Sequence, residues 1–219
     1  MRNAFVRWGA VAAGLAIAAV APAQAQAQKA EAKVSEAARA LLVIDIQNFY
    51  FEGGKLALTG PVEASRQARR LLDRFRARGW PVIHVQHLPK DQSAPSPEAG
   101  DPQYRIHPNV LPVAGETVIG KHNANAFRDT DLLARLRKLG VTGLLICGMQ
   151  THMCVEATAR AAADLGFEVT VAHDACATRP LAFNGTDVPA AQVHAAALAA
   201  LANSYARVVS TDEALAELN

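Results

Sequence analysis

The sequence predicts an α/β protein with one open, mainly parallel sheet of six strands, covered by helices in a Rossmann-like three-layer arrangement. Short apolar segments rich in β-branched residues alternate with longer segments of helical period, which is the pattern of strands joined by crossover helices. The chain has 219 residues, about half of them hydrophobic. That length favours one sizeable core over two domains.

Six segments have the length and composition of buried strands. They lie near 38–46 (ARALLVIDI), 81–86 (PVIHVQ), 116–120 (ETVIG), 142–148 (TGLLICG), 168–173 (EVTVAH) and 206–210 (ARVVS). Four amphipathic helices are expected between them, and the first three end at glycines. These helices are Val62 to Arg78, Thr130 to Leu139, Met153 to Leu165 and Pro189 to Asn203. The segments Leu88–Gly115 and Arg179–Val188 carry neither pattern, and we expect them to be long loops that act as lids or partner contacts.

The N-terminal residues 1–25 are typical of a signal peptide. Arg2 and Arg7 precede an apolar run, and small-x-small sites allow cleavage after Ala23, Ala25 or Ala27. A membrane anchor is the alternative, but the run is shorter than the roughly 20 residues that span a bilayer. We therefore expect export across the inner membrane to the periplasm, a polar leader at 26–37, a folded domain at 38–219, and no membrane span in the mature form.

Composition and cysteine count narrow the class of protein. Charged residues make up 19% of the chain and the formal net charge is +2, with no basic stripe that would suggest a nucleic-acid partner. Three cysteines are an odd number, so at least one thiol is left over, and none has zinc-site spacing. Cys147 and Cys176 form a disulfide or are small buried residues beside strand ends.

Three reactive side chains follow predicted strands. Asp45 closes the first strand, Lys121 follows TVIG, and Cys154 lies after GLLICG where a helix begins. Active sites of open parallel sheets form beyond the carboxyl ends of the strands, so all three should meet at one edge.

Each of these residues has a chemical and a structural interpretation. Cys154 at a helix N-terminus is expected to be a thiolate nucleophile, because the helix dipole and Lys121 favour the charged form and lower its pKa. Asp45 can take the thiol proton and return it to a leaving amine, with Lys121 stabilising both charged states. The alternatives are a buried cysteine without chemistry and a structural ion pair between Asp45 and Lys121.

The segments DIQNFYF, GKHNANAFRDTDL and CGMQTHMCVEATARAAADLGFEVTVAHDACAT resemble, in order and spacing, the isochorismatase-like cysteine hydrolases, which include nicotinamidases and N-carbamoylsarcosine amidases. The resemblance implies the fold of that family and a catalytic triad of Asp45, Lys121 and Cys154. A reaction carried by these three side chains requires no cofactor, so we expect none. It implies a cis peptide between Met149 and Gln150, with the amides of Gln150 and Cys154 as oxyanion hole. Gln47, Tyr50 and Phe127 match positions that line the substrate pocket.

Nicotinamidases of this superfamily bind a divalent ion through an Asp-x-His pair, and that pair is missing from HVQHLPKDQ. His84 and His87 are three residues apart on a strand and should point to opposite faces, so we expect no metal site. His87 or His107 remains a candidate for substrate contact.

We therefore expect a cysteine hydrolase that cleaves a C–N bond of a small amide, ureide or similar substrate through a thioester. Hydrolysis of the vinyl ether isochorismate is one alternative. Members with that activity can lack the cysteine, so the presence of Cys154 favours C–N cleavage over this reaction. The other alternative is a periplasmic protein that binds a small molecule without catalysing a reaction. Related enzymes form dimers or tetramers, so the resemblance also implies a homo-oligomer.

Overall fold

The structure, a computed structural model, describes residues 39–218 except 97 and 99. Its centre is a six-stranded sheet of order β3-β2-β1-β4-β5-β8 in which every neighbouring pair is parallel. The strands are β1 (Arg39–Ile44), β2 (Val82–His87), β3 (Thr117–Lys121), β4 (Gly143–Met149), β5 (Glu168–Ala177) and β8 (Arg207–Val209). The predicted α/β class and all six predicted strands are confirmed.

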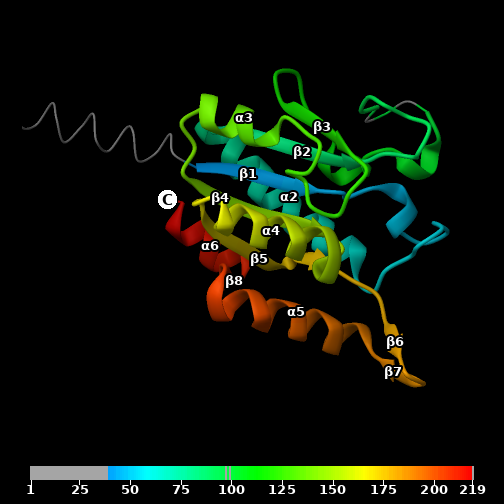
Figure 1. Cartoon of the computed structure of the whole chain (residues 1–219). Helices are drawn as coiled ribbons and strands as arrows, with labels where there is room; N and C mark the ends of the chain where they lie inside the picture. The colour runs from blue at the N-terminus through cyan, green and yellow to red at the C-terminus, as the bar shows by residue number, and fades with distance from the viewer. Residues whose placement is uncertain (1–38, 97, 99, 219) are drawn as a thin grey trace, which may run out of the picture. The chain divides into compact units, whose positions relative to one another are not determined.

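Helices cover both faces of the sheet and make three layers (Figure 1). One face carries α2 (Pro61–Arg78) and α6 (Thr211–Glu217), whose apolar residues share one buried cluster with the sheet. The other face carries α3 (Leu132–Lys138), α4 (Glu156–Asp164) and α5 (Ala190–Ser204), packed in a second cluster. Each predicted helix is present within a few residues of its expected ends.

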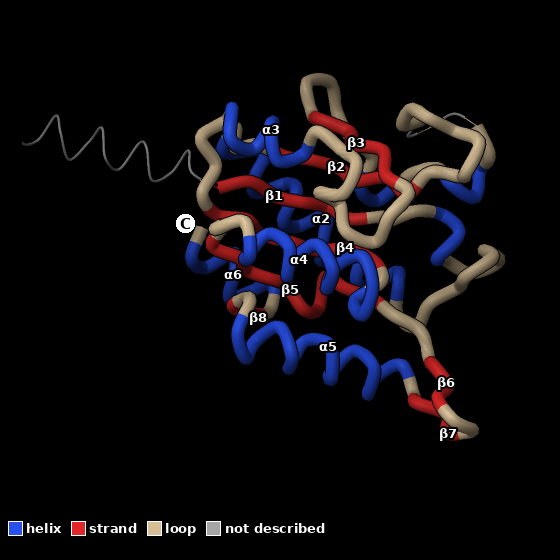
Figure 2. Tube along the Cα trace, viewed as in Figure 1, coloured by secondary structure: helices blue, strands red, loops and turns tan. Residues whose placement is uncertain are grey.

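The loop predictions were wrong in detail. The segment Arg179–Val188 contains an antiparallel hairpin of β6 (Leu181–Phe183) and β7 (Thr186–Val188), which projects away from the sheet (Figure 2). Its turn is Asn184–Gly185, both with positive φ, and Asn-Gly is a strong hairpin signal. The segment 88–115 contains two short 3₁₀ helices, Pro102–Tyr104 and Pro108–Val110, labelled η2 and η3.

Helix α6 was also missed, although its start is well defined. Ser210 and Glu213 form a reciprocal capping box, and Asp174 Oδ1 accepts hydrogen bonds from the backbone N–H and the hydroxyl of Thr211, each 2.7 Å. These contacts supply partners for N–H groups that a helix start leaves free.

The strand order reverses between β1 and β4, which lie side by side at the centre of the sheet. Connections from these two strands leave in opposite directions along the sheet, so a crevice opens where they end. The loops after β1 and β2 gather at this same end in Figure 1. The topology therefore places residues 45–60 and 88–110 around the ends of the central strands.

The predicted signal peptide (1–25) and polar leader (26–37) lie outside the described residues. Within the described part of the chain, no helix is both long enough and apolar enough to cross a membrane.

Candidate active site

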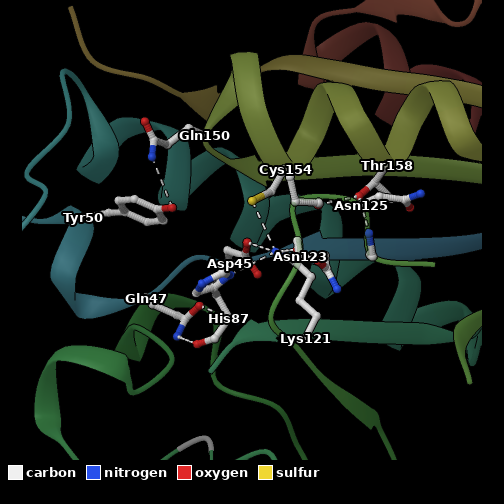
Figure 3. A network of polar contacts seen from close by, with 12 residues as sticks. Asp45, Gln47, Tyr50, His87, Lys121, Asn123, Asn125, Gln150, Cys154 and Thr158 are labelled. Atoms are coloured by element: carbon white, nitrogen blue, oxygen red, sulfur yellow. Dashed lines mark hydrogen bonds and ion pairs between the residues drawn. The ribbon is translucent and has the colours of Figure 1, made fainter. Parts of the chain in front are cut away.

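The three residues predicted to react lie together at the carboxyl ends of the central strands (Figure 3). Asp45 directly follows β1, Lys121 is the last residue of β3, and Cys154 lies in a π-helical turn, Thr151–Val155 (η4), between β4 and α4. Their exposed fractions are 0%, 1% and 6%. The ends of three strands thus place a carboxylate, an ammonium and a thiol together in one buried site.

Lys121 joins the other two residues. Its Nζ lies 2.6 Å from Asp45 Oδ2 and 3.2 Å from Cys154 Sγ, and it donates a further hydrogen bond of 3.0 Å to the carbonyl of Asn123. A buried ammonium is costly without partners, and here three acceptors surround it. The arrangement therefore holds a positive charge directly beside the sulfur.

The backbone around the site has unusual conformations on both central strands. Asp45 has φ +50°, in the left-handed region that few non-glycine residues adopt. The Met149–Gln150 peptide is cis, as the resemblance implied. Gly148 has φ +134°, and a Cβ there would lie 2.0 Å from the carbonyl oxygen of Ile44. Only glycine therefore lets β4 approach β1 this closely. The contact is made at Ile44, the residue directly before Asp45.

The pKa of Cys154 is shifted in the direction opposite to the one expected from the sequence. Burial raises the pKa of Cys154 to about 12; the Asp45 carboxylate adds to the rise, and Lys121 opposes it. Burial alone would lower the pKa of Lys121, but Asp45 and Cys154 outweigh it and hold that pKa above its ordinary value. The expectation of a resting thiolate was wrong because burial and Asp45 together exceed the effect of the ammonium. The balance of burial and charge at this position therefore favours the thiol over the thiolate.

One carboxylate oxygen is free to accept a proton. Asp45 Oδ1 makes no hydrogen bond to any described residue, although it is completely buried. Donor atoms of Asp45, His87 and Cys154 all lie within 4.8 Å of one another. The carboxylate is therefore near enough to the thiol to take its proton after a small movement.

A cavity of about 340 Å³ opens beside Cys154. Tyr50 lines it, as predicted, and its hydroxyl accepts a 3.4 Å hydrogen bond from Gln150 Nε2. Burial, supported by the Asp45 charge, raises the pKa of Tyr50 far above its ordinary value of 10.0, so it stays a phenol. The remaining lining residues are Phe49, Lys55, Leu56, His87, Tyr104, His122, Ala124, Gln150 and Met153.

Two predicted pocket residues have other positions. Gln47 is fully buried and bridges two loops: Nε2 donates to the carbonyls of His87 and Tyr104, and Oε1 accepts from the N–H of His87. Phe127 packs against the second core cluster, 6.1 Å from the ring centre of Phe167. Neither lines the cavity, so the assignment of Gln47 and Phe127 to the substrate pocket stays a prediction that this cavity does not support. Gln47 fixes the loops that form the pocket instead.

His84 and His87 lie on opposite faces of β2, as their spacing predicts. His84 is buried against Glu116, 2.9 Å away, whereas His87 lines the cavity. Burial lowers the pKa of His87 below its ordinary value of 6.5; Lys121 and His122 add to this against the opposing Asp45 charge. His107 stacks on Phe51 and does not line the cavity. Of the two histidines considered for substrate contact, His87 is the one in place.

The group of Asp45, His87 and Cys154 has the donor types of a metal site. Lys121 Nζ, however, contacts both the carboxylate and the sulfur, so an ammonium already occupies the position where a cation would be coordinated. The residues present fit a lysine-based charge arrangement better than a resident metal.

The other two cysteines are buried and free. Burial raises the pKa of Cys147 well above its ordinary value and that of Cys176 to about 12. Of the two interpretations left open by the sequence, the structure has the small buried residues and not the disulfide.

Comparison with known proteins agrees with this fold. The isochorismatase domain family matches residues 39–213. A crystal structure of an isochorismatase hydrolase from Oleispira antarctica is 50% identical, with a TM-score of 0.77 over 83% of this chain and 97% of that one. The isochorismatase family protein YddQ of Bacillus subtilis is 47% identical over 79% of this chain and 96% of its own.

Two relatives have named activities. A maleamate amidohydrolase of Pseudomonas putida is 30% identical over 82% of this chain and 86% of its own. A streptothricin hydrolase of Streptomyces noursei is 37% identical over 70% of this chain, which spans about half (52%) of that protein.

The fold, the buried Asp–Lys–Cys group and these relatives thus define a hydrolase built on a parallel α/β sheet. The chain belongs to the isochorismatase family.

Proposed function

We propose that this hydrolase cleaves a C–N bond of a small amide, ureide or similar substrate through a thioester on Cys154. The observation that carries the proposal is the position of Lys121 Nζ, which contacts both the Asp45 carboxylate and the Cys154 sulfur. This group offers a proton acceptor, a nucleophile and a fixed positive charge at one wall of a cavity.

Acylation begins when Asp45 takes the proton from the Cys154 thiol. The thiolate, stabilised by Lys121, attacks the substrate carbonyl carbon, and a C–S bond forms while the carbonyl oxygen becomes an oxyanion. The backbone N–H groups of Gln150 and Cys154 bind that oxyanion. When the tetrahedral intermediate collapses, the C–N bond breaks and Asp45 returns its proton to the leaving amine or ammonia.

Deacylation uses the same groups in reverse roles. Water gives a proton to Asp45 and adds its oxygen to the thioester carbon, the C–S bond breaks, and the proton returns to sulfur. The buried Asp45 carboxylate acts here as a general base, because it accepts the proton from water in the transition state. This scheme uses only side chains and backbone groups of the chain itself.

Gln150 is suited to orient the substrate. Its Oε1 is buried and makes no hydrogen bond to a described residue, while Nε2 contacts Tyr50. A buried acceptor without a partner costs about 1–3 kcal/mol, and an amide N–H of the substrate would satisfy it. We infer that Gln150 accepts from the nitrogen side of the scissile bond.

One relative is named a maleamate amidohydrolase, which supports amide chemistry. The presence of Cys154 in contact with Lys121 favours acyl transfer to sulfur, because hydrolysis of a vinyl ether needs no thiol nucleophile.

The direct test is ammonia release from a panel of small amides and ureides by the wild type and Cys154→Ala. Cys176→Ala is the matched control, since it removes another buried thiol away from the cavity. We expect Cys154→Ala to lose at least a thousandfold in kcat and Cys176→Ala to keep most activity. Equal loss in both variants, or activity that survives Cys154→Ala, would contradict the thioester scheme. A wild type that binds members of the panel without hydrolysing them would indicate a binding protein without catalysis.

We also propose export to the periplasm, on the strength of the N-terminal segment, which N-terminal sequencing of the mature protein tests. A start at Met1 in the cell-associated protein would contradict it.

We further propose a homo-oligomer. The hairpin exposes Phe183 to 81% and the π-helical turn exposes Met153 to 46%, and apolar groups of this kind are commonly covered by a partner. Light scattering on the purified protein measures the mass, and a monomer at micromolar concentration would contradict this proposal.

A further inference from the structure

The mouth of the cavity carries an ion pair that the hydrolytic scheme does not use. Lys55 lines the same cavity as Cys154. Its Nζ lies 3.5 Å from Asp101 Oδ2 and 5.7 Å from the ring centre of Tyr104. The side chains of Lys55 and Asp101 are 63% and 45% exposed, whereas Cys154 is buried. The pair therefore lies at the solvent side of the cavity and the thiol at its inner wall.

Gln103 holds both members of this pair in place. Its Oε1 accepts a 3.1 Å hydrogen bond from the backbone N–H of Lys55, and its own backbone N–H donates a 2.9 Å bond to Asp101 Oδ1. One residue of the 88–115 segment thus ties the loop after β1 to the loop after β2. These contacts fix the backbone of Lys55 beside the cavity.

The ionisable groups that line the cavity are basic. Among the described residues that line it, Lys55, His87 and His122 bear basic groups and none bears a carboxylate. The two nearby carboxylates are each paired with a lysine, Asp45 with Lys121 and Asp101 with Lys55. An anion that enters the cavity therefore meets Lys55 and no carboxylate in the lining.

Exchange of partners at the mouth costs little. An ion pair as exposed as Lys55–Asp101 contributes little to stability, so a carboxylate of the substrate can replace Asp101 beside Lys55. The aromatic rings of Phe49, Tyr50 and Tyr104 would surround the carbon chain between that carboxylate and the scissile carbonyl.

We propose that Lys55 is a specificity-determining residue that binds a carboxylate on the substrate, so that the preferred substrates are small amides with a carboxylate at the end remote from the amide. Asp101 competes with that carboxylate and weakens its binding. This inference rests on the proposed amidase function for the amide itself, and on the charge and geometry of the mouth for the carboxylate.

Binding can be measured without turnover, by protection of Cys154 against iodoacetamide. The probes are 4-oxopentanoate and 2-pentanone, two ketones without a C–N bond that match succinamate and butyramide in shape and differ in the carboxylate. We expect 4-oxopentanoate to give half-protection at a concentration on the order of fivefold lower than 2-pentanone, since a charge-assisted contact is gained. Raising the salt concentration should reduce this difference.

Four variants test the assignment. Lys55→Met should abolish the preference for the anion, Lys55→Arg should retain it, and Asp101→Asn should increase it while keeping the acceptor for Gln103. Lys138→Met, which removes an equal charge at the exposed end of α3, should change nothing.

The proposal is overturned if the two ketones protect equally in the wild type, or if Lys55→Met behaves like Lys138→Met. Hydrolysis of succinamate and butyramide, measured separately as kcat/KM, tests the amidase function. A protein that hydrolyses neither amide but still prefers the anionic ketone would contradict the amidase function for these amides and leave the assignment of Lys55 supported.

Discussion

Lys121 Nζ lies 2.6 Å from the Asp45 carboxylate, and both side chains are completely shielded from solvent. Removing one member of a buried pair leaves an uncompensated charge, which costs about 3–5 kcal/mol. The pair therefore contributes to folding as well as to the proposed chemistry, and the two contributions have to be measured separately.

The first prediction concerns that pair. Lys121→Met should lower the free energy of unfolding by about 3 kcal/mol and abolish measurable hydrolysis, because Asp45 loses its partner and the thiolate its stabilising charge. Denaturant unfolding and ammonia release measure the two effects. Asp45→Asn with Lys121→Met should recover much of the stability, since no lone charge remains, but none of the activity. Recovered activity in the double variant would show that the pair has only a structural role.

The second prediction concerns the resting state of the thiol. Because burial and Asp45 raise the pKa of Cys154 to about 12, alkylation by iodoacetamide should be slow at pH 7 and should still rise above pH 9, beyond the ordinary free-cysteine pKa of about 8.5. Asp45→Asn removes a negative charge that disfavours the thiolate, so it should speed alkylation at pH 8.

Alkylation at Cys154 is identified by mass spectrometry of the labelled peptide, and wild type and variant are compared in the same buffer. A rate that levels off below pH 8 in the wild type would mean that Lys121 and the helix start outweigh burial after all.

Some features of the site follow from the sequence and others do not. Asp45, Lys121 and Cys154 each follow a buried strand, and parallel strands end at one edge, so their convergence was predictable. The protonation state of Cys154 was not, because it depends on how deeply the sulfur is buried and how near Asp45 lies. Sequence identifies the groups, whereas their energies depend on distances that only the fold defines.

Pocket residues were harder to predict for a related reason. Gln47 lies two residues after Asp45, whose positive φ turns the chain, and its side chain points to loop carbonyls instead of the cavity. Lys55 was missed because it belongs to an irregular turn without periodicity. The hairpin, by contrast, could have been found from its Asn184–Gly185 turn.

The third prediction concerns the close approach of β4 to β1. Gly148→Ala should lower the free energy of unfolding by more than about 3 kcal/mol, because the added Cβ would lie 2.0 Å from the Ile44 carbonyl oxygen and φ is +134°. Gly166→Ala is the control: its φ is also positive, at +89°, but nothing lies within 4 Å of the new Cβ. It should cost about 1 kcal/mol. Equal losses measured by denaturant unfolding would show that φ, not the contact with Ile44, determines the need for glycine.

The last prediction concerns acid stability and Glu116. Burial alone would raise the pKa of Glu116, but hydrogen bonds from Arg76 and His84 outweigh it and hold the pKa far below its ordinary value of 4.5. A carboxyl whose folded pKa is depressed adds stability above its unfolded pKa, and this is lost as the pH falls towards the folded value. Glu116→Gln should therefore lower the free energy of unfolding by about 1–3 kcal/mol at pH 7, and the difference from wild type should shrink below about pH 4.5.

Glu63→Gln is the matched control for Glu116, because Glu63 is paired with Arg66 on the surface with 72% of its side chain exposed. Its effect should stay below about 0.5 kcal/mol at every pH, since exposed ion pairs contribute little. Urea unfolding between pH 3 and 8 gives both curves. A constant difference between wild type and Glu116→Gln across this range would mean that the contacts of Glu116 with Arg76 and His84 stabilise the fold through shape and not through charge.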